Sequence, residues 1–197
     1  MLPLQEINIM ENFFMNFEIK PETIVPFIGL LESYERTIPE GNEGRVIARI
    51  YVESPGGEVQ YTEALYHFLK NSKYEYEFVV LSAYSCALML LIALNPRNLV
   101  IHQGSSGLTH LIGLNVSTRD TKADNRFFVA KRLEHLEESN NQIIDVFKHL
   151  LTKEELLLHK QGEDVYLSST RLLGIFEKIN STKTIKDKVK KIFEKPN

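Results

Sequence analysis

The chain has 197 residues, of which 43% are hydrophobic and 25% charged, so we expect one folded domain and not a disordered chain. A formal net charge of −3 and a pI near 6.1 argue against a surface built for nucleic acid. No apolar run reaches the roughly 18 to 20 residues of a membrane-spanning helix, and the first residues lack a signal-peptide pattern. Cys86 is the only cysteine, so no disulfide forms within the chain and we expect a cytoplasmic protein.

The first half of the chain alternates segments typical of strands with segments typical of helices. Residues 20–38 are predicted as a helix, because Pro21 suits an opening turn and apolar residues follow at helical spacing. Those apolar positions are Ile24, Phe27, Leu30, Leu31 and Tyr34. Residues 58–72 are a second amphipathic helix. The segments predicted as strands are 6–17, 45–54 and 77–83. This alternation predicts an α/β domain with a mostly parallel sheet.

The second half begins with an apolar helix at 86–94 and strand segments at 98–103 and 107–113. A long charged helix with a broken apolar stripe is expected over 121–149. Residues 152–160 are a further helix, in which Thr152 is the N-cap and Glu155 completes a capping box. Residues 180–197 are expected as a basic helical extension that docks on the body or on a partner and does not insert into a membrane.

Ser85 stands where the strand at 77–83 gives way to the apolar helix. It is either the N-cap of that helix or a nucleophile held where the free N–H groups of a first turn stabilise an oxyanion. A second junction, "ESPGGEV", has two glycines that expose backbone N–H groups. If the two strands are neighbours, the N–H groups of Gly57 and Cys86 converge beside Ser85, as a tetrahedral acyl intermediate requires. The Cys86 thiol itself is expected to be a small apolar filler.

A serine nucleophile needs a base, usually histidine, and a carboxylate that orients the imidazole. His102 and His110 both lie in the strand region after the Ser85 helix, and either could return to the site. The remaining histidines lie on charged helices and are expected at the surface: His67, His135, His149 and His159. The residues alone leave four candidates for the carboxylate: Asp120, Asp124, Asp145 and Asp164.

Three segments carry motifs that resemble one known family. "IYVESPGGEV" resembles a strand followed by an "SPGG" turn, "SAYSCALMLLIAL" resembles "AxASMGAxLLxAG", and "EDVYLSS" resembles "RDxFMSA". These are motifs of the Clp protease proteolytic subunit family, which has the ClpP/crotonase fold. The resemblance covers roughly residues 13–179, and the first two motifs are the more specific ones.

The resemblance assigns roles residue by residue. Ser85 falls on the nucleophile, His110, 25 residues later, on the base, and Asp164 on the triad acid. The oxyanion donors that it implies are the backbone N–H groups of Gly57 and Cys86, and the substrate-binding turn includes Gly56.

Departures from the family pattern keep some alternatives open. The family's "HQP" is "HLI" after His110, whereas "HQ" occurs at His102, so His102 stays as a rival base. Glu163 stands where the family has an Arg that joins rings, and Arg49 replaces an aromatic residue of the family's ATPase-docking pockets. The N-terminal segment is also shorter than the family's axial loop.

The resemblance therefore implies a ClpP-like peptidase domain over 1–179, built as a repeated ββα superhelical spiral with a protruding handle helix. We expect a serine endopeptidase that self-associates into a heptameric ring or a double ring and cleaves peptides or unfolded proteins. An AAA+ unfoldase is an uncertain partner, and no cofactor, metal, nucleic acid or membrane is expected. The alternatives are a catalytically silent ClpP-like scaffold and, less favoured, a crotonase-like acyl-CoA enzyme.

Overall fold

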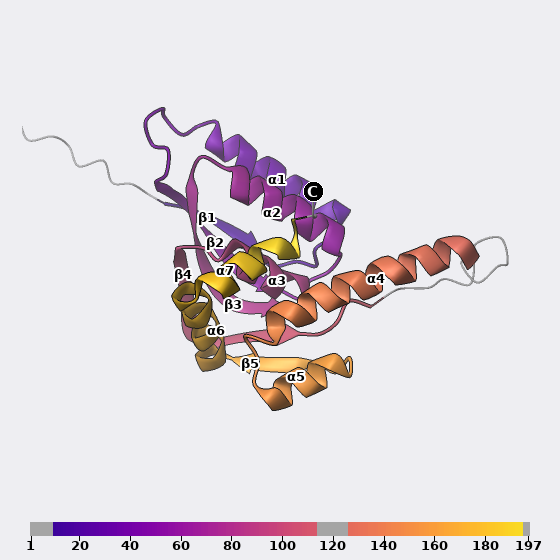
Figure 1. Cartoon of the computed structure of the whole chain (residues 1–197). Coiled ribbons are helices and arrows are strands. Elements are labelled where there is room, and N and C mark those ends of the chain that lie inside the picture. The colour runs from indigo at the N-terminus through magenta and orange to yellow at the C-terminus, as the bar shows by residue number, and fades with distance from the viewer. Residues whose placement is uncertain (1–9, 114–125, 195–197) are drawn as a thin grey trace, which may run out of the picture.

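The computed structural model describes residues 10–113 and 126–194, which form a five-stranded sheet covered by helices (Figure 1). The strand order across the sheet is the order along the chain. The strands are β1 (Glu11–Met15), β2 (Val46–Ser54), β3 (Glu75–Tyr84), β4 (Asn98–Thr109) and β5 (Val165–Ser168). The first four are parallel and β5 is antiparallel to β4, so the predicted α/β domain with a mostly parallel sheet is confirmed.

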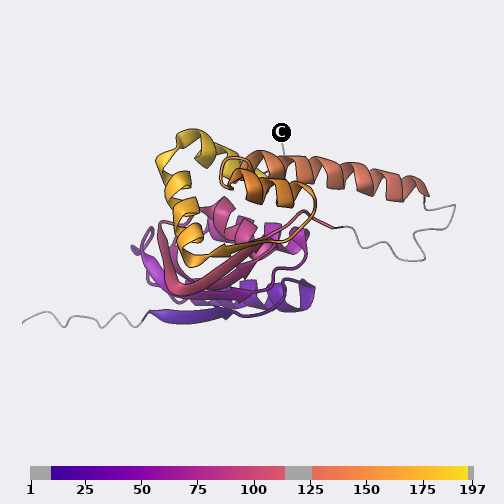
Figure 2. The ribbon, with the colours of Figure 1, turned by 90° about the horizontal axis from the view of Figure 1, so that it is seen from below.

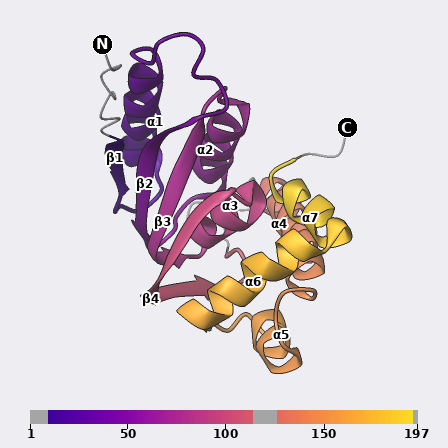
Figure 3. The same ribbon diagram turned by 90° about the vertical axis from the view of Figure 1, so that its left-hand side faces the viewer.

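Three helices make the crossovers between the parallel strands: α1 (Pro21–Glu35), α2 (Val59–Asn71) and α3 (Cys86–Leu94). Each crossover moves one strand along the sheet in the same direction, and such crossovers are right-handed. The three helices consequently lie in succession on one face (Figure 3). In many parallel sheets a reversal of the strand order opens a crevice that holds the site. Here the order does not reverse, so we expect a site to form where the carboxyl ends of two neighbouring strands meet.

Part of the core lies between the sheet and these helices, and buried residues of the later helices complete it. Eight of the nine residues of α3 are buried, which explains why its sequence is apolar on every side. In α1 the residues Ile24, Phe27 and Leu31 are buried as expected, but Leu30 is 59% exposed. The predicted stripe of α1 was therefore too wide by one position.

Helix α4 (Arg126–Phe147) projects beyond the rest of the molecule in two perpendicular views (Figures 1 and 2). Its C-terminal part is anchored, where Ile143, Val146 and Phe147 are buried. The expected start of this helix at residue 121 lies outside the described residues. Within the described ranges, no helix is both long enough and apolar enough to cross a membrane.

The chain after α4 folds back onto the sheet. Helix α5 (Lys153–Lys160) has the predicted capping box, in which the Glu155 N–H donates to Thr152 Oγ1 at 3.2 Å and the Thr152 N–H donates to Glu155 Oε2 at 2.7 Å. Strand β5 and helix α6 (Ser169–Ser181) follow, and neither was predicted as an element.

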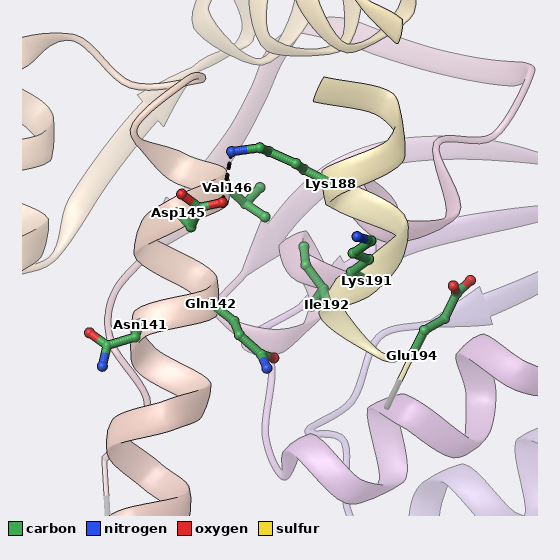
Figure 4. A pocket seen from close by; sticks show the side chains of 8 residues that line it. All are labelled: Asn141, Gln142, Asp145, Val146, Lys188, Lys191, Ile192 and Glu194. Atoms are coloured by element: carbon green, nitrogen blue, oxygen red, sulfur yellow. Dashed lines mark hydrogen bonds and ion pairs between the residues drawn. The ribbon is translucent and has the colours of Figure 1, made fainter. Parts of the chain in front are cut away.

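The C-terminal extension forms α7 (Lys183–Val189) and a 3₁₀ turn (Lys190–Ile192), and it docks on the body as expected. Ile185, Val189 and Phe193 are buried. Lys188 Nζ contacts Asp145 Oδ2 of α4 at 2.8 Å, at one end of a cavity of about 570 Å³ between α4 and the extension (Figure 4). The extension thus packs against the root of the projecting helix.

Candidate active site

Ser85 connects β3 to α3 in a conformation that serine rarely adopts. Its φ is 52° and its ψ is −124°, whereas positive φ is normally left to glycine. The backbone is held there because the Ser85 N–H donates to the Leu108 carbonyl at 2.8 Å. Ser85 does occupy the N-cap position of α3, but its side chain makes no capping hydrogen bond, so its hydroxyl is not used to cap the helix.

The hydroxyl of Ser85 contacts the imidazole of His110 instead, with 2.6 Å between Oγ and Nε2. The register of the sheet explains this contact. Tyr84 of β3 pairs with Leu108 of β4, so the residues that follow each strand emerge side by side. The rival base, His102, is exposed and follows Ile101, which pairs with Val80, four positions before Tyr84 on β3 and so about 13 Å from the end of that strand.

Asp164 approaches the other side of the same imidazole. Its Oδ1 lies 3.5 Å from His110 Nδ1, which is an ion-pair distance and longer than a charge-assisted hydrogen bond of about 2.8 Å. Strand β5 brings it there, because Val165 pairs with Thr109 and each is next in sequence to one of the two site residues. Asp145 is instead paired with Lys148 and Lys188, and Asp120 and Asp124 lie outside the described residues.

The structure thus brings Ser85, His110 and Asp164 together in the order hydroxyl, imidazole, carboxylate. The side chains of His110 and Asp164 are 39% and 50% exposed, so the site is open to solvent and to a substrate. Such an arrangement can lower the barrier for proton removal from the hydroxyl, since the carboxylate stabilises the imidazolium that forms. The catalytic roles themselves stay predictions.

The turn at Gly56 and Gly57 packs directly against the Ser85 junction. Both glycines have positive φ, 91° and 149°. A Cβ on Gly56 would lie 2.7 Å from the Ser85 Cβ, and a Cβ on Gly57 would lie 2.7 Å from the Ile19 N. Side chains at these positions are excluded by their neighbours as well as by the backbone.

The two residues whose N–H groups are the predicted oxyanion donors are in contact with one another. The Cys86 thiol donates a hydrogen bond to the Gly57 carbonyl, with 3.2 Å between sulfur and oxygen. Cys86 opens α3, where a helix has no internal acceptor for its first N–H groups. The Cys86 side chain is buried as expected, and burial raises the pKa of its thiol. The thiol therefore stays protonated and links the two junctions.

A cleft of about 730 Å³ begins at Gly57 and runs between α2 and α4. Three carboxylates line it: Glu18, Glu58 and Glu63. Its other wall is formed by Ile112, Gly113 and one face of α4 that includes His135 and Leu136. Gly57 is the residue that this cleft shares with the candidate site.

His159 is a site residue that sequence reasoning missed. It was expected at the surface with the other helical histidines, but its side chain is completely buried. Its Nε2 lies 3.2 Å from the Oγ1 of Thr109, the residue before His110. The expectation for His135 is confirmed, since its side chain is 77% exposed. The signal that could have found it is the run of three leucines before His159, of which Leu156 lies three positions earlier on the same helical face and packs partly against the core.

No family model matches this chain, and no curated protein matches its sequence. Among the residues that the structure describes, no group of three or more His, Cys, Asp or Glu side chains is placed to hold a metal ion. The fold and the site define an α/β protein in which Ser85 and His110 follow the carboxyl ends of the neighbouring parallel strands β3 and β4, and Asp164 precedes the antiparallel strand β5. The conclusions below depend on that geometry.

Proposed function

We propose that the protein is a serine endopeptidase that resembles the Clp protease proteolytic subunit and has the ClpP/crotonase fold. One observation carries the proposal: Ser85, at a positive φ and without a capping bond, lies 2.6 Å from His110. A serine held in an unfavourable conformation and pointed at an imidazole is costly for a purely structural role. The sequential parallel strands and the projecting α4 support the handle-bearing spiral of this fold.

In this mechanism Ser85 Oγ attacks the carbonyl carbon of a peptide bond while His110 Nε2 takes its proton. The carbonyl oxygen becomes an oxyanion that the N–H groups of Gly57 and Cys86 stabilise. His110 then gives the proton to the leaving amine, and water attacks the acyl-enzyme with His110 again as base. Asp164 orients the imidazole throughout and stabilises its charged form.

The proposal includes assembly of several chains into a ring or a double ring, with α4 as the element that reaches another copy. Such a chamber would restrict substrates to peptides and unfolded proteins of the cytoplasm. Docking of an AAA+ unfoldase is the least supported part. Arg49 forms an ion pair with Glu77 of the neighbouring strand, so a charged pair lies where the resemblance implies an aromatic docking surface.

The test compares Ser85→Ala with the wild type in two assays, cleavage of casein or fluorogenic peptides and labelling by a fluorophosphonate. Ser181→Ala is a matched control, because that hydroxyl lies at the far end of α6 and donates to the Lys178 carbonyl of its own helix at 3.2 Å. We expect Ser85→Ala to lose both cleavage and labelling, and the Ser181→Ala control to keep both. Unchanged turnover in Ser85→Ala would rule out the assignment.

A catalytically silent scaffold subunit is the second candidate. The separation of 3.5 Å between Asp164 and His110 favours it, because a working triad holds these groups in a closer hydrogen bond. The same fluorophosphonate experiment separates the candidates. Steady labelling of Ser85 supports the peptidase, and absence of labelling in an assembled protein supports the scaffold.

A further inference from the structure

Helix α5 fully buries a histidine, where its composition predicts a leucine. Leu157 and Leu158 are 58% and 45% exposed and Leu156 packs partly against the core, whereas His159 is fully buried. An amphipathic helix ordinarily turns its leucines inward and its histidines outward. A local rule broken in this way is expected at functional positions.

The buried His159 reaches the residue that precedes the candidate base. Its Nε2 lies 3.2 Å from Thr109 Oγ1, and its ring packs on the Phe147 ring with 5.1 Å between centroids. Thr109 is itself 1% exposed and ends strand β4, so this bond connects α5 to the point where the chain leaves the sheet toward His110. Thr109 also pairs with Val165, which follows Asp164.

This arrangement is unfavourable for folding alone. Burial first, and the charge of nearby His110 second, lower the pKa of His159 to about 4, so its ring is neutral at physiological pH. Its Nδ1 is buried and has no hydrogen-bond partner among the residues that the structure describes. Replacing a buried polar pair by apolar groups of the same shape is often neutral or stabilising. The Thr109–His159 pair therefore needs a reason other than stability.

We propose that His159 is a positioning residue of the candidate catalytic site, which holds the end of β4 through Thr109 so that His110 faces both Ser85 and Asp164. This inference rests on the proposed serine peptidase function. The bond acts on the backbone that bears His110 and touches neither the substrate nor the reacting atoms. Without it, we expect His110 to adopt several orientations, only some of which contact Ser85.

The test is the double variant Thr109→Val/His159→Leu, which removes both polar partners and keeps their approximate volumes. We expect its thermal midpoint to equal or exceed that of the wild type, while kcat for a fluorogenic peptide falls about 10- to 100-fold and KM changes little. His159→Gln retains a donor near the position of Nε2, so we expect it to recover most of the activity. Each single variant should lose about as much as the double, because the pair acts as a unit.

The NMR signals of the His110 ring give a readout that does not need catalysis. We expect one set of His110 signals in the wild type and broadened or multiple sets in the double variant. A folded double variant with wild-type kcat and unchanged His110 signals would overturn the proposal. If the double variant does not fold, the same two measurements on Thr109→Val, kcat and the His110 signals, decide between the outcomes. If the wild type neither cleaves nor labels, the peptidase function fails, but the His110 signals still decide whether His159 positions that ring.

Discussion

At the scale of single residues, the backbone conformations of the site lower the stability of the fold. Ser85 occupies a backbone region that costs a non-glycine residue about 1 to 3 kcal/mol, and Gly56 and Gly57 take positive φ in the facing turn. Both sides of the candidate oxyanion site thus depend on unusual backbone conformations. Stability and function should therefore separate when these residues are changed.

The first prediction concerns Ser85. Ser85→Gly and Ser85→Ala both remove the hydroxyl and its bond to His110, but only glycine relieves the positive φ. We expect Ser85→Gly to unfold with a free energy about 1 kcal/mol higher than Ser85→Ala, and both variants to be inactive. Urea denaturation at one pH measures the difference. A less stable Ser85→Gly would mean that the junction is not strained.

The second prediction concerns Gly57. An alanine there would meet the backbone of Ile19, and the β-bridge between these residues would be lost. We expect Gly57→Ala to lower the free energy of unfolding by about 3 kcal/mol or more and to abolish labelling of Ser85. Gly162→Ala is the matched control, because Gly162 has φ 83° but open space around it. Gly162→Ala should lower the free energy of unfolding by only about 1 kcal/mol, the cost of a positive φ at a residue other than glycine.

At the scale of elements, the sequence predicted the segments with a clear period and missed those without one. The alternation of strands and helices up to β4 was predictable, as was the capping box at Thr152. Strand β5 has only four residues and is recognised by its pairing with β4, which no local pattern encodes. The spacing of Ser85 and His110 was identified through the family resemblance and not through any period.

His159 shows the limit of pattern reasoning most directly. The charged residues of α5 predict a solvated helix, and its three leucines would be the residues expected to face inward. Leu156 packs partly against the core, but Leu157 and Leu158 are exposed. Tertiary contacts reversed that choice, because Thr109 and Phe147 surround the ring. A buried polar pair of this kind depends on residues 50 positions apart, so a single helix cannot reveal it.

The third prediction follows from the protonation of His159. Its pKa is lowered to about 4 in the folded chain, below the value of about 6.5 in an unfolded chain, so between these values the unfolded chain binds more protons. The free energy of unfolding should therefore fall as the pH drops from about 6.5 to about 4, by on the order of 3 kcal/mol, with no further contribution below that. Urea titrations across this range measure the slope.

In His159→Leu this part of the pH dependence should disappear. His135→Gln is the matched control, because that side chain is 77% exposed and its removal should leave the slope unchanged. Retention of the full slope in His159→Leu would show that other groups cause it. Glu155 contributes in a lower range, since the hydrogen bond from Arg171 lowers its pKa and its share is lost as the pH falls through the folded value.

At the scale of the whole molecule, charge is unevenly distributed around the candidate site. The chain carries a net charge of only −3, yet Glu18, Glu58 and Glu63 all line the cleft that begins at Gly57. Glu18 has Lys20 at 3.7 Å and Glu63 has His67 at 3.7 Å, whereas the Glu58 carboxylate accepts a hydrogen bond from the neutral Gln60 amide at 3.1 Å. The field in the cleft should therefore favour cationic groups of a substrate.

The last prediction is a preference of the peptidase for basic peptides. A charge pair at about 4 Å is worth about 1 kcal/mol in water and more beside a protein wall, so matched peptides with Lys should be cleaved roughly 5- to 10-fold faster than those with Glu at low salt. The preference should nearly vanish at 1 M salt, where the screening length is about 3 Å. The double variant Glu58→Gln/Glu63→Gln should reduce it, whereas Glu40→Gln, on an exposed loop, should not. Equal cleavage of both peptides at low salt would show that the carboxylates do not face the bound chain. Labelling of Ser85 in the same samples would show that the catalytic site is nonetheless intact.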